Sequence, residues 1–575
     1  MSAADAAILV ADGRRAGTAA HGVCVGTVKG PGQSPHEYTF ITPNRAMLVK
    51  QGEFVYYELA YGGETLQVIG RVSGWRPVRL YPDTFMADPE VPPSQVAAVL
   101  GFDSEEYELF EVTVTVIGYY DAQLKTFVNP RLPPRSGWPV YLVPGETLAA
   151  VLSRRRPGEV GSAQIGWLLS RPRGEVPITL SVKDLTGTHL AIIAGTGAGK
   201  SYLASVIVEE LMKPVNRACV LIVDPHGEYD TLVEMQGHPA FTEGDLITGY
   251  TPAVRVLRPE HVKVRTGVLS LHDWYYLLPD LSERMRYVFG RAFRRLQRER
   301  GDRFTKEDLV AAVQSIRADG REDEASDPDV SGGALTWRIQ NLVENARIIS
   351  DYEDLQLREL FRPGQCTVLQ LNEIEQRQQQ VILSVLLRRL YRARIDTERR
   401  LIDERDERYL PYPVFVLIEE AHRFAPANAD VVSTQILKEI LAEGRKFGVG
   451  VGLISQRPGK LDADVLSQCM TQCIMRIVNP IDQNAVASAV ESVGRDLLAE
   501  LPGLSKGQVI VSGAALNTPV LCQVRERLTR HGGEDKDAPA EWLAYFQDRN
   551  RERRREQQAF LPSDGGFSIF RSVDS

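Results

Sequence analysis

A glycine-rich loop between an apolar run and a helical stretch constrains this chain more than any other feature. The apolar residues 190–194 lead into GTGAGKS at 195–201, and the sequence YLASVIVEELM that follows has the composition of a buried helix. A strand, a glycine loop and a helix in this order are typical of a Walker A phosphate-binding loop. The backbone N–H groups of such a loop and the helix N-terminus can surround a phosphate.

Two side chains at the end of this loop carry specific expectations. Lys200 can reach the β and γ phosphates of a nucleotide, and Ser201 can hold Mg²⁺. Ala194 stands where the G-x-x-x-x-G-K-S pattern has its first glycine, which alanine can replace if φ there is negative. The alternative is a glycine loop that arose by chance. The expected nucleotide contacts are Gly195, Thr196, Gly197, Ala198, Gly199, Lys200, Ser201 and Tyr202.

A second apolar run, at 414–418, ends in two acidic residues, Glu419 and Glu420. This is the form of a Walker B strand, whose first acid positions Mg²⁺ and whose second orients or deprotonates the attacking water. Glu419 replaces the usual Asp, and its longer side chain favours contact with the metal through water. We expect Glu420 to be catalytic. The alternative is a strand that runs into an acidic helix N-terminus, which the helix dipole favours without any catalysis.

Two more strand ends carry polar residues. Gln456 follows the run 450–454 and can sense the γ-phosphate or position water, unless it marks a plain strand–loop junction. Asp224 follows the run 219–223, and with Glu228 it can support the nucleotide pocket. His226, between them, is either part of this pocket or a buried, hydrogen-bonded group.

The pattern of apolar residues divides the chain into four parts. Residues 1–150 contain short apolar runs with turn signals, which favour a small β-barrel or sandwich, and an arginine- and proline-rich hinge follows at 151–175. From 176 to 525, uniformly apolar runs alternate with helical stretches, which predicts a parallel sheet between helices, with a helical insertion at about 255–350. Residues 526–575 read as a charged helix and tail. The expected strands are 23–28, 38–41, 54–59, 66–72, 107–117, 139–143, 190–194, 219–223, 367–371, 414–418, 450–454 and 474–478.

Composition excludes few functions. The 575 residues are too many for one ordinary core, and the formal net charge of −8 neither requires nor excludes nucleic acid. We find no apolar run long enough for a membrane span and no secretory signal. The six cysteines are scattered, which suits a reduced, cytoplasmic protein without a membrane role.

Five motifs together resemble one family. AGTGAGKS, DPHGEY, LIEEAHRFAP, AEGRKFGVGVGLISQRP and MRIVNPIDQ, in this order, are similar to those of the HerA family of hexameric DNA translocases, which belongs with the FtsK-like motors. The resemblance covers about residues 176–525, and the first 150 residues match only by position and strand pattern. It implies an α/β fold: a RecA-like P-loop ATPase core with a parallel sheet, an N-terminal small β-barrel and a helical insertion. It also implies a homohexamer that binds ATP and Mg²⁺ between neighbouring subunits.

The same resemblance implies an arginine supplied by the next subunit. We carry this role to Arg445, with Lys446 as a weaker candidate and Arg476 as a further one. A fixed guanidinium suits the charge that develops on the transferring phosphoryl group. The alternative for each residue is a solvated surface cation.

The resemblance further implies a partner and a substrate. Double-stranded DNA would pass through the ring, held by its phosphate backbone, and a NurA-type nuclease would dock on the N-terminal barrels for DNA-end resection in repair. Related anti-phage systems pair such an ATPase with another effector, such as an NADase. A regulatory scaffold and a membrane-associated secretion or conjugation ATPase are the rival interpretations. Candidate DNA contacts are Arg377 and the basic face of Arg291, Arg294, Arg295 and Arg298, unless these are solvated helix faces.

Overall fold

The computed structural model describes residues 22–32, 36–43, 47–78, 109–242, 249–319, 329–490, 493–532 and 537–559. The chain forms two units, Met1–Arg530 and His531–Ser575. Within the second unit the described structure is one helix, α18 (Ala538–Ala559). A mobile loop expected at 318–333 falls mostly outside the described residues, and a strand-like end expected at 567–570 falls wholly outside them.

The N-terminal strands form a closed, antiparallel barrel. The order is β2-β1-β7-β3-β4-β5, and β2 also pairs with β5, so the sheet has no free edge along this path. Alternate residues of β2 point inward, and its Tyr38 ring packs edge-to-face on Tyr57 at 5.4 Å between ring centroids. The predicted small barrel is therefore confirmed. Its strands are β1 (Cys24–Pro31), β2 (Glu37–Thr42), β3 (Phe54–Tyr61), β4 (Glu64–Val78), β5 (Leu109–Asp121), β6 (Thr126–Val128) and β7 (Pro139–Leu142).

A second sheet holds eleven of the described strands, in the order β12-β15-β11-β16-β17-β10-β18-β19-β20-β8-β9. The first seven pair in parallel, as the sequence predicts. The carboxyl ends of these strands therefore meet at one edge of the sheet. The parallel strands are β10 (Leu190–Ile193), β11 (Val220–Asp224), β12 (Ala253–Leu257), β15 (Gln365–Gln370), β16 (Val414–Ile418), β17 (Val449–Ser455) and β18 (Thr471–Ile474).

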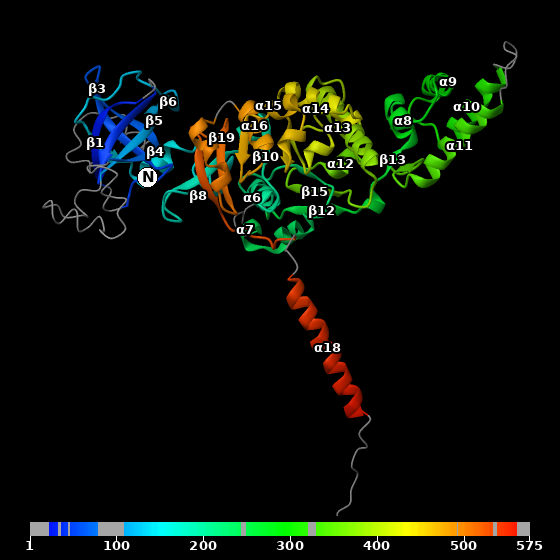
Figure 1. Cartoon of the computed structure of the whole chain (residues 1–575). Helices are drawn as coiled ribbons and strands as arrows, with labels where there is room; N and C mark the ends of the chain where they lie inside the picture. Colours follow the sequence, from blue (N-terminus) through cyan, green and yellow to red (C-terminus); the bar gives the residue numbers. More distant parts are fainter. Residues whose placement is uncertain are drawn as a thin grey trace, which may run out of the picture. The chain divides into compact units, whose positions relative to one another are not determined.

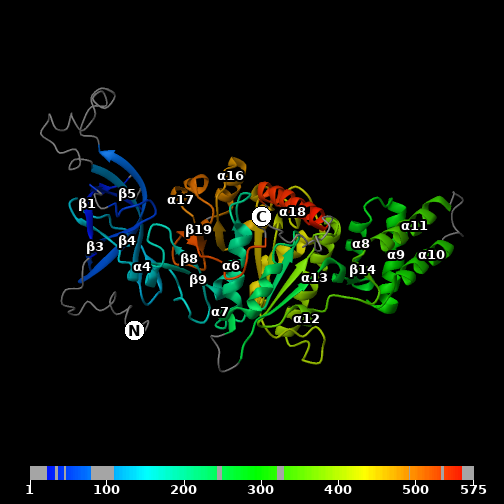
Figure 2. The ribbon, with the colours of Figure 1, turned by 90° about the horizontal axis from the view of Figure 1, so that it is seen from below.

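The uniformly apolar strands are buried on both faces because two separate cores cover the sheet. Ala191 and Ile193 of β10 belong to the core that contains helices α13 (Gln376–Glu398) and α14 (Val432–Glu443). Leu190 and Ile192 belong to the core that contains α6 (Lys200–Met212). Figures 1 and 2 show α6 and α13 on opposite sides of the strands. The alternation of a strand thus distributes four consecutive apolar residues between two cores.

Four antiparallel strands extend the sheet beyond β18: β19 (Gln508–Gly513), β20 (Val520–Val524), β8 (Ser162–Leu168) and β9 (Pro177–Ser181). β8 lies within 151–175, where we expect a hinge. Arg171, in the same stretch, bonds Glu53 of the barrel at 2.8 Å and the carbonyl of Val143 at 2.8 Å.

The strand expected at 474–478 is wrong by several residues. β18 ends at Ile474, and the following residues leave the sheet. The carbonyl of Arg476 accepts a hydrogen bond from the Gly195 N–H at 2.8 Å. This residue therefore bonds the glycine loop and not a neighbouring strand. Met475 and Ile477 are buried nonetheless, which explains why their apolar character suggested a strand.

Helices α8 (Leu271–Leu277), α9 (Glu283–Arg300), α10 (Lys306–Asp319) and α11 (Asp329–Asn345) lie in sequence between β12 and β15, and Figure 1 shows them as a group beside the sheet. The Ser282 hydroxyl caps α9 by accepting from the Met285 N–H. Trp274 is fully buried and packs near Phe289. No helix of the described residues is long and apolar enough to cross a membrane.

Candidate nucleotide site

The glycine loop connects β10 to α6 at the carboxyl edge of the parallel strands. Gly197 (φ 75°) and Gly199 (φ 105°) lie in the left-handed region, where a side chain would be strained. Gly199 is also the N-cap of α6, so the loop presents its N–H groups at the helix N-terminus. Ala194 is buried and is not among the residues with positive φ, so its backbone meets the condition that the sequence sets.

Neighbouring strands anchor this loop on both sides. The Gly195 N–H bonds the carbonyl of Arg476 after β18, and the Thr196 hydroxyl donates to Gln456 Oε1 at 3.3 Å after β17. Gln456 is thus held beside the loop, where it can contact a terminal phosphate. Arg476 is exposed and flanks the loop of its own subunit.

Lys200 lies between the two acids of the Walker B strand. Its Nζ forms an ion pair and hydrogen bond with Glu419 Oε1 and lies 3.2 Å from Glu420 Oε1. The Tyr229 hydroxyl donates to the second oxygen of Glu419 at 2.5 Å. Both oxygens of this fully buried carboxylate therefore have partners within the subunit.

Burial and these partners act in opposite directions on the pKa values. Burial raises the pKa of Glu419 to about 7, and the charge of Lys200 and the bonds from Lys200 and Tyr229 oppose this rise. Burial lowers the pKa of Lys200, but the charges of Glu419 and Glu420 outweigh it and leave this pKa above its usual value. Lys200 is therefore a fixed ammonium, ready to exchange a carboxylate for a phosphate.

Glu420 has an unusual backbone for a residue with a side chain. Its φ of 51° and ψ of 46° are left-handed, a conformation that costs energy outside glycine and clusters at functional sites. The side chain is almost fully buried, and no group among the described residues donates a hydrogen bond to Oε2. His422 Nδ1 lies 3.2 Å from this oxygen, but without hydrogen-bond geometry. Oε2 can thus accept a proton or a hydrogen bond from water.

The turn after β11 is built around Asp224. Its carboxylate accepts from the N–H groups of His226 (3.2 Å), Gly227 (2.8 Å) and Tyr229 (3.2 Å). Burial raises the pKa of Asp224, and these N–H bonds lower it. Asp224 therefore shapes the turn that delivers Tyr229 to Glu419.

The other two polar residues of this turn differ in their surroundings. The charge of Glu228 raises the pKa of Lys200, which places this carboxylate near the site. His226 is about 43% exposed at its side chain and lies 4.0 Å from Glu420 Oε1. The alternative that His226 is a buried, hydrogen-bonded group is therefore wrong.

Sequence reasoning missed two residues of this network, Tyr229 and His422. Tyr229 is the last residue of the DPHGEY motif, and its aromatic ring could have indicated a buried position. His422 stands two positions after Glu420, and its Nδ1 also lies 3.3 Å from the Ser455 hydroxyl at the end of β17. Burial lowers the pKa of His422, while the charge of Glu420 raises it. His422 thus lies between Glu420 Oε2, after β16, and the Ser455 hydroxyl, at the end of β17.

Ser201 and Glu419 are the oxygen donors that fit Mg²⁺. Ser201 is half-buried in the first turn of α6, and Glu419 faces the same ammonium that a phosphate would attract. The described residues contain no group of three or more His, Cys, Asp or Glu that could hold a metal alone. This donor set suits Mg²⁺, which uses few protein ligands together with phosphates and water. Lys200 and Tyr229 each bond one carboxylate oxygen of Glu419. Contact between Glu419 and Mg²⁺ through a water molecule therefore fits better than direct ligation.

Tyr202, expected to contact the nucleotide, meets the segment that ends the first unit. Its hydroxyl accepts from the Arg527 N–H at 2.8 Å, and the Arg527 guanidinium lies 5.8 Å from its ring centroid. Glu209 on α6 accepts the N–H groups of Leu528 and Thr529, so this segment is bound along the nucleotide helix.

Arg445 and Lys446 lie at the other end of β17. They belong to the short 3-10 helix Gly444–Phe447, which precedes the strand, and both are exposed. The seven residues of β17 place them about 20 Å from Gln456. Neither side chain reaches the glycine loop of its own subunit.

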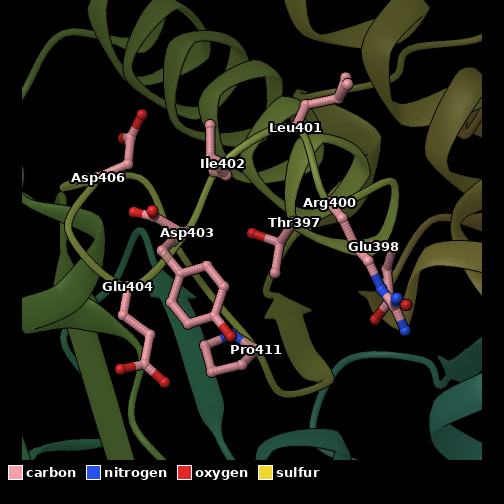
Figure 3. Close-up of a pocket in the computed structure, with 10 residues that line it drawn as sticks. Thr397, Glu398, Arg400, Leu401, Ile402, Asp403, Glu404, Asp406 and Pro411 are labelled. Atoms are coloured by element: carbon pink, nitrogen blue, oxygen red, sulfur yellow. The ribbon is translucent and has the colours of Figure 1, made fainter.

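Near this amino edge lies a hollow of about 750 Å³ that Figure 3 shows in close-up. Its wall includes the carboxylates of Glu398, Asp403, Glu404 and Asp406. Hydrogen bonds from Arg408 lower the pKa of Asp406 to about 2. The negative charge of these carboxylates repels phosphate. We therefore do not assign the nucleotide to this hollow.

Comparison with known proteins agrees with the motifs. Residues 163–390 match the family model "Helicase HerA, central domain". A probable helicase of Methanocaldococcus jannaschii is 30% identical over 89% of this chain and 98% of its own length. The DNA double-strand break repair helicase HerA of Pyrococcus furiosus is 29% identical over 76% of this chain and 84% of its own. The solved VirB4 of Thermoanaerobacter pseudethanolicus is 14% identical, with a TM-score of 0.44 over 63% of this chain and 96% of that one. The chain belongs to the HerA family.

Proposed function

We propose that this chain is an ATP-driven translocase of double-stranded DNA. The observation that carries the proposal is Glu420, a buried carboxylate in a strained backbone. One of its oxygens lies beside Lys200, and the other receives no hydrogen bond from the part of the chain that the structure describes. This arrangement suits a base that orients water next to a bound phosphate. The names of the relatives, which include a DNA double-strand break repair helicase, support DNA as the substrate.

Each group of the site has a separate role in the proposed reaction. Ser201 and Glu419 would hold Mg²⁺, which when bound would neutralise charge on the phosphates. Lys200 leaves Glu419 for the β and γ phosphates, while Tyr229 keeps Glu419 in place. Gln456 contacts the γ-phosphate or the water, and Glu420 Oε2 orients that water in line.

The proposal includes a ring. Arg445 is exposed and about 20 Å from Gln456 beside its own glycine loop, so a role in catalysis would require the site of another subunit. A homohexamer with ATP between subunits gives Arg445 such a site, with Lys446 as its weaker alternative. A NurA-type nuclease on the barrel face, and DNA-end resection as the process, complete the proposal on the strength of the motif resemblance.

The test is steady-state ATPase activity with and without linear duplex DNA, with Lys200→Ala as the inactive control. A motor that grips the phosphate backbone predicts strong stimulation that fades as salt rises. Activity that is indifferent to DNA would contradict the translocase and favour a scaffold that regulates an effector. Activity that survives Lys200→Ala would contradict the phosphate-loop assignment itself.

A further inference from the structure

The helical insertion carries an arginine-lined hollow that the nucleotide site does not use. The hollow has a volume of about 540 Å³ and lies between α9 and α10. Its wall consists of Arg291, Arg294, Arg295, Gln297, Arg298 and Ile316.

Helix α9 is built to present these cations on one face. Its other face buries Phe289, Ala292, Phe293 and Leu296. Arginines at 291, 294 and 298 follow the three- and four-residue spacing of a helix surface, and all three are exposed. They span about 10.5 Å along the axis, from seven residues at about 1.5 Å each.

Within the described residues, most of this charge has no carboxylate partner. Arg295 pairs with Glu299 at 2.9 Å. Among the described residues, no carboxylate lies within ion-pair distance of Arg291, Arg294 or Arg298. Their contacts are different: Arg291 lies 5.8 Å from the Tyr287 ring centroid, and Arg298 Nε donates to the Arg294 carbonyl at 3.3 Å. Three guanidiniums in one hollow repel each other unless an anion joins them.

We propose that this face of α9, formed by Arg291, Arg294 and Arg298, binds the phosphate backbone of double-stranded DNA. This inference rests on the proposed DNA-translocating function and extends it to a second contact surface on the insertion. Duplex DNA carries one negative charge per about 1.7 Å of axis, so a 10.5 Å row of about three guanidiniums faces several phosphates. Arginine forks also match phosphate oxygens two at a time.

The composition of the hollow favours DNA over an acidic protein. Protein interfaces have an apolar or aromatic centre that supplies most of the affinity. The apolar residue that lines this hollow is Ile316, and only about 8% of its surface is exposed. Contacts to a phosphate backbone need no such centre, because the release of counterions drives them.

The test compares two triple variants of the full-length protein in fluorescence anisotropy with a labelled linear duplex over a range of salt. One is Arg291→Gln/Arg294→Gln/Arg298→Gln. The control is Arg284→Gln/Arg303→Gln/Arg347→Gln, which removes the same charge from exposed positions of the same insertion. Circular dichroism and thermal unfolding check that both variants fold.

The proposal predicts that the hollow variant loses about 0.9 in the logarithmic salt slope for each phosphate contact, and binds the duplex about 100-fold more weakly near 0.1 M salt. The control should bind like the wild type. Equal slopes and affinities for the two variants would overturn the proposal. Retained DNA binding with lost binding to polyglutamate would also overturn it and assign the hollow to an acidic protein. A wild-type protein that binds no duplex would instead contradict the proposed function.

Discussion

The two ends of β17 differ in almost every respect. At its carboxyl end, Ser455 contacts His422, which lies beside the buried pair of Lys200 and Glu420, and Gln456 bonds the Thr196 hydroxyl of the glycine loop. At its amino end, Arg445 and Lys446 are exposed, on a short 3-10 helix. At the carboxyl end, Lys200, Glu419 and Asp224 are therefore already bonded within the subunit, whereas the amino end presents two exposed cations.

This difference separates what one subunit can do from what it cannot. A single chain holds the phosphate loop, both Walker B acids and Gln456 at the same edge, which is enough to bind and orient a nucleotide. Stabilisation of the transferring phosphoryl group needs a further fixed cation. The described site contains the exposed Arg476 beside the loop, and the neighbouring subunit would add Arg445. The following substitutions test this division of labour.

Lys200→Ala should have the largest effect. It removes the cation that bridges the β and γ phosphates and leaves Glu419 and Glu420 facing each other without their shared partner. We expect ATP turnover to fall below detection in a steady-state phosphate-release assay. Lys213→Ala, just after the end of the same helix, is the matched control, since its charge pairs with Glu210 and lies away from the glycine loop. Equal loss in both variants would indicate general damage to α6.

Arg445→Ala should reduce kcat by about 10³–10⁵, the range for an arginine supplied in trans, while nucleotide binding persists. The measurement that locates its action uses mixed rings of Arg445→Ala and Glu420→Gln subunits. If the two act across one interface, mixing creates some sites with both residues intact and restores activity. Mixed rings that stay inactive at every ratio would place Arg445 outside the neighbouring site. The proposed division of roles between the two ends of β17 would then be wrong.

Sequence patterns locate the carboxyl-edge site well because its residues follow apolar strands directly. Lys200, Glu420 and Gln456 each come within a few positions of a strand end, and parallel strands must bring such ends together. The same reasoning misses Tyr229, although it too follows a strand end, β11. Tyr229 reaches Glu419 across 190 positions, and nothing in its local pattern separates a buried hydroxyl with a partner from an ordinary core tyrosine.

The fold shows the same limit. Most barrel strands and six of the seven parallel strands follow from apolar runs and turns. By contrast, β12 falls at the start of the expected helical insertion, and β8 joins the sheet by antiparallel pairing with β20, more than 340 positions away, with β9 paired to β8. Pairing over such a distance leaves no local periodicity. The shifted β18 has another cause, since Met475 and Ile477 are buried beyond the end of the strand, where the Arg476 carbonyl between them bonds the glycine loop.

Glu420→Gln should lower kcat by about 10²–10⁴, the usual contribution of a positioned base, with little change in nucleotide affinity. The amide keeps the size of the side chain but cannot take a proton from water. Glu443→Gln, at the exposed end of α14, serves as the control. Filter binding of labelled ATP and single-turnover hydrolysis separate the two steps. A variant with reduced binding and unchanged single-turnover rate would assign Glu420 to ground-state contacts.

Tyr229→Phe should have the smallest effect and probe the link between the turn after β11 and the Walker B strand. The change removes one hydrogen bond to a buried carboxylate, a loss of about 1–3 kcal/mol when the acceptor stays buried. Glu419 then has Lys200 as its remaining partner, and Lys200 must leave when phosphate binds. We therefore expect a higher Mg²⁺ requirement for ATP turnover, with a smaller change in kcat at saturating Mg²⁺. Tyr250→Phe removes a comparable hydroxyl, bonded to the Met212 carbonyl at 2.8 Å and away from both acids. If the two variants show the same Mg²⁺ dependence, Tyr229 contributes only to packing, and the metal-side acid is held by Lys200 alone.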